Sequence, residues 1–389
     1  MILEVSRLRI VHVIDYFQPQ LGYQETFLAK EQSKQGHEIF VVTSDRYSPI
    51  VSAVLAKRIK GSGFFTEENI NVWRLRTLFE LPNAIWLIGL VDKIYELQPD
   101  VVYIHGIACI NSIRLALIKR KFNLKLIYDD HMTFNLSRSK LKILYPFFKH
   151  TFSKIIQRNA EAFVAVGDAS KVFMNKVYGI PTNNIKVIYM GADVNIFKFD
   201  SHSRSQIRNS YGISDDETLF IYTGKIIPLK KIHFLVEVAE LLSMYKVRFL
   251  IIGSGVSLYI DNLKRSIKLK NLNDKFIWHD SVHNNELPKF YSAADAAIWP
   301  ADASISMLEA LSCGLPVIMS DSPNINEKIP YGEQLTYREG NLRELAVLMK
   351  EIISSDHTED TRKAYQSNIQ ERISWENIAA EFTVLAKGI

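Results

Sequence analysis

Residues 248–255 read Arg248-Phe-Leu-Ile-Ile-Gly253-Ser-Gly255, an apolar strand that runs directly into a small glycine turn. Strands that are apolar throughout, without polar alternation, are typical of parallel sheets that helices cover on both faces. Comparable runs rich in Val and Ile recur along the chain and alternate with segments of helical period. The pattern predicts an α/β fold built from βαβ units.

The predicted strands fall into two sets. In the first half they cover residues 8–14, 38–43, 72–75, 101–105, 124–128, 162–166 and 185–189, and in the second half residues 219–223, 248–252, 275–278, 296–299 and 317–319. Residues 193–210 between the two sets are polar and lack sustained periodicity, which places a domain boundary near residue 200. We therefore expect two doubly wound, Rossmann-like domains.

Length and composition agree with two globular domains. The 389 residues (44.7 kDa) exceed what one hydrophobic core usually serves, and 47% are hydrophobic against 23% charged. Cys109 and Cys313 are too few for a disulfide framework and too far apart for a zinc pattern, which suits a reducing compartment. No apolar run approaches the roughly 18 residues of a spanning helix, and the first residues lack the pattern of an export signal. The expectation is a cytoplasmic protein that does not cross a membrane.

Positive charge is concentrated in one part of the chain. Eleven Lys or Arg face two acids between Arg114 and Arg158, a local charge of +9 in a chain whose total is +5. From Arg138 to Arg158 these cations are interleaved with Leu, Ile, Phe and Tyr, which suits an interfacial helix on anionic lipid. The alternative is a packed helix with a solvated basic face, and the sequence pattern is common to both.

Ligands of open α/β sheets bind beyond the carboxyl ends of the strands, so the loop after residue 223 is a candidate site. It reads Gly224-Lys225-Ile-Ile-Pro-Leu-Lys230-Lys231. Lys225 and Lys230 could clamp a diphosphate and neutralise the charge that grows on a departing phosphate oxygen. A solvated basic loop is the alternative.

The segment after the strand 296–299 is the second candidate. Ser304 is a plausible N-cap of a helix whose free N–H groups could hold phosphate, and Glu309, about a turn further, could reach a ribose hydroxyl pair. The alternative is that Glu309 only complements the helix dipole, a contribution of about 0.3–1 kcal/mol.

Three features of the first half follow strands. The loop containing Gly22 and Tyr23 starts a helix and could approach a ligand, although a plain turn is the alternative. His105 favours a structural role, whereas for His131 a structural and a functional role remain equally open.

Several signatures are missing. The sequence has no zinc pattern, no phosphate loop of the Gly-x-x-x-x-Gly-Lys-Ser/Thr type, no Gly-x-Ser-x-Gly elbow and no Gly-x-Gly-x-x-Gly fingerprint. Asp129-Asp130 is not an Asp-x-Asp metal clamp, and Gly253-x-Gly255 favours a tight turn. We expect no obligatory metal and no cofactor.

The order and spacing of these pieces resemble the retaining GT-B-fold glycosyltransferases of the family numbered four, over nearly the whole chain. The resemblance is carried by the opening Asp15-Tyr-Phe-Gln-Pro-Gln-Leu-Gly22, by Ile188-Tyr-Met-Gly-Ala-Asp193, by the segment from Gly224 to Lys230, and above all by Glu309-Ala-Leu-Ser-Cys-Gly314-Leu-Pro-Val.

The resemblance implies roles for individual residues. Lys225 and Lys230 would bind the donor diphosphate beside Gly224, and Glu309 would bind the ribose. His131 would lie next to the transferred sugar, and Gly22 and Tyr23 would lie on the acceptor side. The base would be held by backbone groups at Val282, and phosphate by the amides of Ser304, Ile305, Ser306 and Met307.

The sequence departs from the family pattern at four positions. Where the family has a first glutamate that touches the donor sugar, this chain has Ala301, and the adjacent Asp302 is the candidate substitute. Ser304 and Lys225 replace an expected glycine and arginine, and a lysine lacks the bidentate fork of arginine. Tyr23 replaces the second glycine of the opening loop.

The resemblance implies two Rossmann-like domains facing each other across a deep cleft. Residues 1–200 would serve the acceptor, residues 201–374 the nucleotide-sugar donor, and residues 375–389 would form a helix crossing back to the first domain. Retention would proceed without an enzyme nucleophile, so positioning and leaving-group stabilisation would supply the rate.

A UDP-sugar is the favoured donor, with a GDP-sugar as the alternative, and the expected acceptor is a lipid-linked or cell-surface glycan precursor at the inner face of the plasma membrane. Two rival functions remain: a UDP-sugar epimerase, and a nucleotide-sugar-binding protein without catalysis. Nucleic-acid binding is not expected, because no recognition motif is evident.

Overall fold

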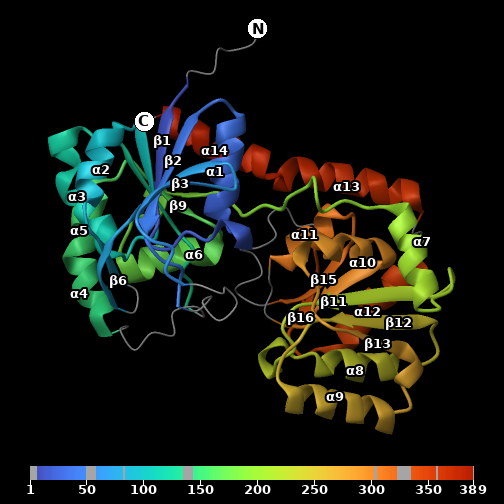
Figure 1. The fold of residues 1–389 in the computed structure, drawn as a ribbon. Helices are drawn as coiled ribbons and strands as arrows, with labels where there is room; N and C mark the ends of the chain where they lie inside the picture. The colour runs from blue at the N-terminus through green and yellow to red at the C-terminus, as the bar shows by residue number, and fades with distance from the viewer. Residues whose placement is uncertain are drawn as a thin grey trace. The chain divides into compact units, whose positions relative to one another are not determined.

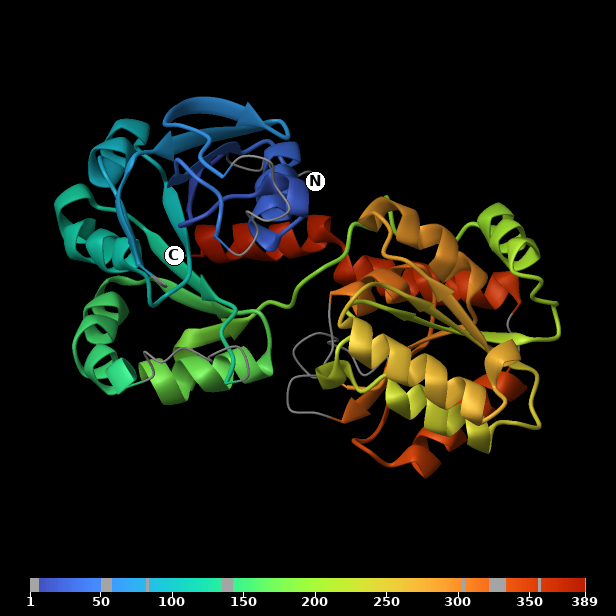
Figure 2. The ribbon, with the colours of Figure 1, turned by 60° about the horizontal axis from the view of Figure 1, so that its bottom comes forward.

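A computed structural model describes residues 7–49, 58–81, 84–134, 143–301, 305–321, 334–355 and 358–388 (Figures 1 and 2). The chain divides into two compact units. Unit 1 comprises Met1–Met190 together with Trp375–Ile389, and unit 2 comprises Gly191–Ser374.

Unit 1 is built on a sheet that, within the described residues, has eight strands in the order β10-β9-β8-β7-β1-β2-β4-β3. All neighbours pair in parallel except β3 and β4. The strands are β1 (Arg9–Val13), β2 (Glu38–Ser44), β3 (Gly63–Glu67), β4 (Ile70–Leu75), β7 (Val101–His105), β8 (Leu126–Asp130), β9 (Ala162–Ala165) and β10 (Ile185–Val187). A separate antiparallel hairpin consists of β5 (Thr77–Leu81) and β6 (Ala84–Leu87).

Helices cover both faces of this sheet, and successive strand residues alternate between two apolar cores. Val11 and Val102 pack in the core beneath α2 (Leu90–Leu97), α3 (Ile110–Phe122), α5 (Phe152–Asn159) and α6 (Asp168–Phe173). Ile10 and Tyr103 pack in the other core, against α1 (Gln24–Lys34) and α14 (Trp375–Lys387). A short helix, α4 (Tyr145–His150), precedes α5. Burial on both faces explains why these strands are apolar throughout.

The last helix of the chain belongs to unit 1. In Figure 1, α14 lies beside α1, and the Tyr103 hydroxyl donates a 2.6 Å hydrogen bond to the Phe382 carbonyl. The rings of Phe27 and Trp375 stack with centroids 5.1 Å apart. Residues far apart in sequence therefore close one face of the unit 1 sheet.

Unit 2 has a parallel sheet with the order β13-β12-β11-β14-β15-β16 among the described residues. Its strands are β11 (Thr218–Thr223), β12 (Val247–Ile252), β13 (Phe276–His279), β14 (Ala296–Trp299), β15 (Val317–Asp321) and β16 (Gln334–Arg338). Its helices are α7 (Ser201–Ser210), α8 (His233–Leu241), α9 (Ser257–Leu269), α10 (Leu287–Ala293), α11 (Ser306–Ser312), α12 (Leu342–Ser354) and α13 (Glu359–Ile373). Every residue of β11 is buried, as expected for the central strand of such a sheet.

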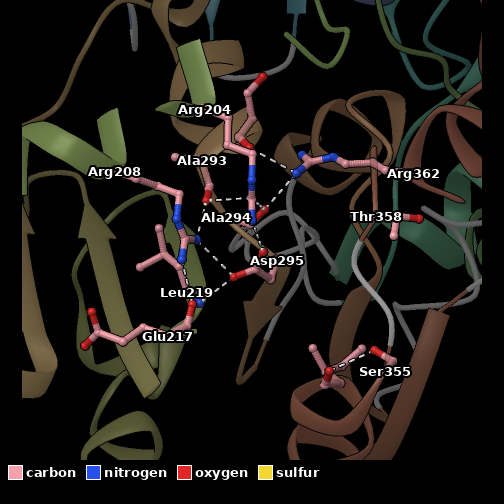
Figure 3. Close-up of polar contacts among 12 residues, drawn as sticks. Arg204, Arg208, Glu217, Leu219, Ala293, Ala294, Asp295, Ser355, Thr358 and Arg362 are labelled. Carbon is pink, nitrogen blue, oxygen red and sulfur yellow. Dashed lines mark hydrogen bonds and ion pairs between the residues drawn. The ribbon is translucent and has the colours of Figure 1, made fainter. Parts of the chain in front are cut away.

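The segment expected to be a featureless connection, residues 193–210, contains helix α7. Asp200 caps the helix by accepting a 2.8 Å hydrogen bond from the Ser203 amide. Two arginines of α7 are drawn in Figure 3 around Asp295: Arg204 Nη2 lies 2.7 Å from Oδ1 and Arg208 Nη1 lies 3.2 Å from Oδ2. The polar composition that suggested a linker therefore belongs to a helix that is anchored by charge.

Further elements differ from the sequence expectation. Strand β3, the β5–β6 hairpin and strand β16 were not predicted. The residues of β3 alternate between half-buried and exposed, and those of β5 are largely exposed, so neither has the continuous apolar run on which the prediction rested. Strand β8 begins at Leu126 and not at residue 124, because the Leu124 amide bonds the Lys119 carbonyl and completes the end of α3. As a consequence, Asp129 and Asp130 lie inside the strand.

Candidate functional site

The predicted donor residues lie at the carboxyl edge of the unit 2 sheet. The strand order reverses between β11 and β14, since β12 and β13 lie on one side of β11 and β14 to β16 on the other. Such a switch point opens a crevice between the loops that follow the two strands. The segments flanking it are the loop from Gly224 to Lys230 after β11, and the residues from Ile305 to Glu309 after β14.

Two glycines after β12 hold the loop after β11 in place. A Cβ at Gly253 would lie 1.9 Å from the Gly224 carbonyl oxygen, and a Cβ at Gly255 would lie 1.9 Å from that of Ile226. The Ile226 amide bonds the Ser254 carbonyl at 2.9 Å. The Gly-x-Gly turn therefore serves close backbone packing, and the Gly224 loop is fixed along its length by its neighbour.

A buried tyrosine links the two sides of the switch point. The Tyr291 hydroxyl lies 2.8 Å from Thr223 Oγ1 at the end of β11 and 3.3 Å from the Ser306 carbonyl at the start of α11. Trp299 Nε1 donates to the Thr223 carbonyl at 3.0 Å. The loop after β11 and the helix after β14 are thereby held at a fixed separation.

Glu309 is the most informative side chain of this edge. It is 5% exposed, and its Oε1 accepts a 2.9 Å hydrogen bond from Asn284 Nδ2. Its Oε2 is buried and has no hydrogen-bond partner among the residues that the structure describes. Burial raises the pKa of Glu309 to about 7, and the Asn284 hydrogen bond opposes that rise. A buried acceptor without a donor is costly, so this oxygen is suited to receive a hydroxyl from a ligand.

The other predicted donor residues that the structure describes lie in loops that follow strands of the same sheet. The Lys225 side chain is exposed while its carbonyl accepts from the Tyr222 hydroxyl at 2.9 Å. Lys230 ends a short helical turn, Pro228–Lys230, and the adjacent Lys231 pairs with Glu339. Val282 lies in the loop after β13, two residues before Asn284. Asp302 and Ser304 lie outside the described residues.

In unit 1 the strand order reverses between β1 and β7, so the corresponding crevice lies between the loops after these two strands. The loop after β1 ends at Gly22, whose φ of 63° lies in the left-handed region that favours glycine. Tyr23 follows as the N-cap of α1 and is 44% exposed. Gly22 and Tyr23 therefore present the start of α1 at this edge.

A buried polar cluster lies beneath α1. On the face of the sheet that α1 covers, the apolar residues Ile10, Tyr103 and Ile127 are each followed, two positions on, by a polar one: His12, His105 and Asp129. His12 Nδ1 lies 3.0 Å from His105 Nε2, and His105 Nδ1 lies 2.9 Å from Asp129 Oδ2. The single-histidine interpretation of His105 missed this pairing, because it depends on three strands that are distant in sequence.

Two further groups face this cluster. Glu25, in the first turn of α1, is 6% exposed, and burial raises its pKa to about 7 although His105 opposes the rise. His131 follows β8, and burial lowers its pKa while Asp129 opposes that change. Sequence reasoning assigned nothing to Glu25 or His12. Two features of the sequence could have indicated them: His12 interrupts the apolar strand Val11-His12-Val13, and Glu25 closely follows the Gly22 loop.

Among the described residues, no group of three or more His, Cys, Asp or Glu side chains is arranged to hold a metal ion. Within the same residues, no helix has the length and apolar character needed to span a bilayer.

The described residues form two Rossmann-like sheets, each with a switch point in its strand order. Two family models match it: the model described as Glycosyltransferase Family 4 covers residues 26–196, and the model described as Glycosyl transferases group 1 covers residues 203–372. The chain belongs to these glycosyltransferases, and its fold is GT-B.

Individual relatives are distant. The glycosyltransferase MJ1607 of Methanocaldococcus jannaschii is 25% identical over 229 residues, which cover 56% of this chain and 57% of that protein. The processive diacylglycerol alpha-glucosyltransferase of Acholeplasma laidlawii is 23% identical over 256 residues, or 64% of this chain and 75% of the relative. The crystal structure of Anabaena Alr3699/HepE in complex with UDP superposes with a TM-score of 0.72 at 17% identity, covering 98% of this chain and all of that one.

Proposed function

We propose that this glycosyltransferase moves a sugar from a nucleoside diphosphate sugar to an acceptor hydroxyl, with retention of anomeric configuration. The observation that carries the proposal is the buried, unpartnered Oε2 of Glu309 at the switch point of unit 2. A ribose offers two adjacent hydroxyl donors, and a carboxylate can accept both. The glycosyltransferase family to which the chain belongs supplies the reaction class.

The remaining donor contacts follow from the same edge. Lys225 and Lys230 neutralise the diphosphate, and the lysine charge stabilises the leaving phosphate as the glycosidic bond breaks. The amides of Ile305, Ser306 and Met307 at the start of α11 bind phosphate oxygens. Backbone groups at Val282 bind the base, and Gly224 lets the backbone approach the diphosphate. His131 of unit 1 contacts the transferred sugar.

We favour a UDP-sugar as the donor, because the HepE structure with the same fold binds UDP. Retention is supported by the name of the Acholeplasma relative, an alpha-glucosyltransferase, since nucleotide-activated glucose is itself α-linked. Asp302 is proposed to replace the donor-sugar glutamate that is absent at Ala301. Gly22 and Tyr23 form the acceptor side.

The experiment is a titration of UDP, GDP, ADP and dTDP followed by thermal shift, since a ligand stabilises the folded state by RT ln(1 + [L]/Kd). We expect UDP to stabilise the wild type and Lys230→Ala to lose that stabilisation. Lys231→Ala is the matched control, because the neighbouring lysine is engaged with Glu339. A stabilisation by GDP alone would overturn the UDP assignment. An equal loss of the UDP-induced stabilisation in Lys230→Ala and Lys231→Ala would contradict a specific role of Lys230 in binding the diphosphate.

We also propose that the acceptor is lipid-linked and that unit 1 binds the inner face of the plasma membrane from the cytoplasm. A surface pocket of about 380 Å³ is lined by cations and amides without a carboxylate: Lys149, His150, Lys154, Gln157, Arg158, Gly179 and Asn184. On the preceding turn Ile143 is 83% exposed and Phe147 is 59% exposed. Exposed apolar side chains close in sequence to a cluster of cations are suited to an anionic bilayer surface.

Flotation with vesicles of phosphatidylglycerol and phosphatidylcholine tests this second proposal. We expect binding that falls with salt and that is lost in Lys154→Glu/Arg158→Glu. The charge-matched control is Arg265→Glu/Lys268→Glu on α9. Binding that is equally reduced in both variants, or absent in the wild type at low salt, would contradict membrane association.

A further inference from the structure

A chain of hydrogen bonds in unit 1 starts and ends on the same helix. From α1, Gln32 Oε1 lies 2.9 Å from His12 Nε2 on β1. His12 contacts His105 on β7, and His105 contacts Asp129 on β8, at the distances given above. Asp129 Oδ2 then accepts a 3.1 Å hydrogen bond from Gln24 Nε2, which returns the chain to α1.

The protonation of His105 follows from the amide orientation of Gln32, in which Oε1 faces His12 Nε2 while Nε2 is buried without a partner among the described residues. In this orientation Gln32 Oε1 accepts and His12 Nε2 donates, and burial lowers the pKa of His12 to about 3, which keeps that ring neutral. The other nitrogen of His12 therefore accepts, and the donor facing it is His105 Nε2. Because His105 Nδ1 also donates to the Asp129 carboxylate, both nitrogens of His105 carry a proton and the ring is an imidazolium.

The surrounding charges agree with this assignment. Burial alone lowers the pKa of His105, but the Asp129 carboxylate and then Glu25 raise it overall. Burial alone raises the pKa of Asp129, but His105 and, more weakly, His131 and His12 lower it overall. The rings of His12 and His105 are nearly parallel, with centroids 5.3 Å apart, and the Tyr103 ring centroid also lies 5.3 Å from that of His12.

The two ends of the chain hold α1 at two points. Gln24 and Gln32 are eight residues apart, which places them on the same face of the helix. Gln24 stands in the first turn, directly after Gly22 and Tyr23. If His105 loses its Nε2 proton, His12 and Gln32 must exchange their donor and acceptor roles, whereas Gln24 continues to donate to the Asp129 carboxylate.

We propose that His105, held as a buried imidazolium between Asp129 and His12, is a positioning residue that fixes the start of α1 and with it the loop at Gly22 and Tyr23. Its consequence for sugar transfer rests on the proposed function, in which this loop lies on the acceptor side. The proposal concerns the protonation and the anchoring, and both are measurable without a substrate.

The protonation is tested by long-range ¹H–¹⁵N NMR of the histidine rings of the full chain. At about pH 7 we expect His105 to show protons on both nitrogens and His12 to show the neutral Nε2–H tautomer. In Asp129→Asn we expect His105 to become neutral. A neutral His105 in the wild type, or a His12 protonated at Nδ1, would overturn the proposal.

The anchoring is tested by amide hydrogen exchange. Gln24→Ala and Gln32→Ala should accelerate exchange at the start of α1 by roughly 10- to 100-fold. This is the effect expected from losing one hydrogen bond to a charged group, or to a group that is itself hydrogen-bonded to a charged one. Gln35→Ala is the matched control, because Gln35 lies at the end of the same helix and its side chain bonds the Glu376 carbonyl and Thr383 on α14. Equal acceleration in all three variants would contradict the anchoring.

A second readout separates positioning from a general loss of structure. Asp129→Asn should lower the rate of sugar transfer from UDP-glucose to a membrane lipid extract by roughly 10- to 100-fold, while the Kd of UDP changes by less than about twofold. Loss of UDP binding together with activity would indicate global unfolding and overturn a positioning role. If UDP fails to bind the wild type, the proposed donor site fails, while the NMR and exchange results still decide this inference.

Discussion

Each unit has a buried glutamate in the first turn of a helix beside its switch point, and the two glutamates differ in their surroundings. Glu25 lies in the first turn of α1 after β1, and Glu309 lies in the first turn of α11 after β14, each beside the switch point of its sheet. Burial raises the pKa of both to about 7. Glu25 faces an ion-paired His105 and Asp129 that the protein itself supplies. Glu309 has one neutral neighbour, Asn284, and one oxygen without a donor.

The difference indicates what each site requires from a ligand. In unit 1 the charges compensate one another in the absence of substrate, so the edge is organised in advance. In unit 2 the cost of the buried carboxylate is offset only when a partner arrives, which is typical of a binding site. The following predictions test this contrast, beginning with the largest effect.

Removing Asp129, the partner of His105 in unit 1, should lower the free energy of unfolding more than removing Asn284, the partner of Glu309 in unit 2. Asp129→Ala breaks the buried ion pair with His105, which must then give up its second proton, and removes the hydrogen bond from Gln24; it is expected to lower the free energy of unfolding by about 3–5 kcal/mol. Asn284→Ala removes one hydrogen bond from a group that can become neutral, and should cost about 1–2 kcal/mol. Urea unfolding of both variants measures the two losses. Equal losses would contradict the idea that unit 1 is the more strongly organised edge.

The pH dependence of stability should contain a contribution from each glutamate. The folded state holds these protons more tightly than the unfolded chain, because both pKa values are raised from 4.5 to about 7. The stabilisation is therefore complete below about pH 4.5 and is lost as the pH rises through about 7, by about 3 kcal/mol for each group. Urea unfolding at about pH 5 and about pH 8 measures this loss.

The variants Glu25→Gln and Glu309→Gln should each remove one of the two contributions. Saturating UDP should remove only that of Glu309, because the ligand then supplies donors to the ionised form. A pH dependence unchanged in Glu309→Gln would show that its surroundings are not as apolar as the structure indicates.

Part of this structure could be predicted from the sequence alone. The fold was predicted because buried parallel strands leave continuous apolar runs, as in β11 and β12, and the GT-B assignment was confirmed by the family models and the structural neighbours. The edge strands β3 and β16 and the hairpin were not predicted, because their residues alternate in burial or are exposed and so form no continuous apolar run. Helix α7 was not predicted, because the residues that anchor it are arginines paired with Asp295, which is distant in sequence.

The candidate sites divide in the same way. Glu309, Lys225 and Lys230 could be proposed from the sequence because they follow strand ends in short local motifs. The cluster of His12, His105 and Asp129 was not found, because its members are separated by more than 20 residues each and are joined only by strand order and register. Motifs within one loop are visible in sequence, whereas contacts across a sheet require the topology.

Exchanging the carboxylate for an amide should distinguish the two glutamates as ligand groups. Glu309→Gln keeps the shape but removes charge-assisted acceptance, so UDP affinity should fall by about 1.5–3 kcal/mol, or roughly 10- to 150-fold. Glu25→Gln in unit 1 is the matched control and should leave the Kd of UDP within about twofold of the wild type. Isothermal titration calorimetry measures both. A comparable loss in Glu25→Gln would contradict the assignment of the nucleotide to unit 2.

The smallest expected effect concerns the cation of the donor loop. Lys225 is exposed and keeps the charge of the arginine expected by family resemblance, but it lacks the bidentate fork that matches a phosphate. Lys225→Arg should therefore raise UDP affinity by only about two- to fivefold, because a solvated cation gains little from geometry alone. Lys231→Arg, on the neighbouring lysine paired with Glu339, should leave the affinity unchanged. A gain that persists at high salt would indicate that the diphosphate, once bound, withdraws this side chain from solvent, whereas a loss of affinity would show that the loop is shaped for lysine.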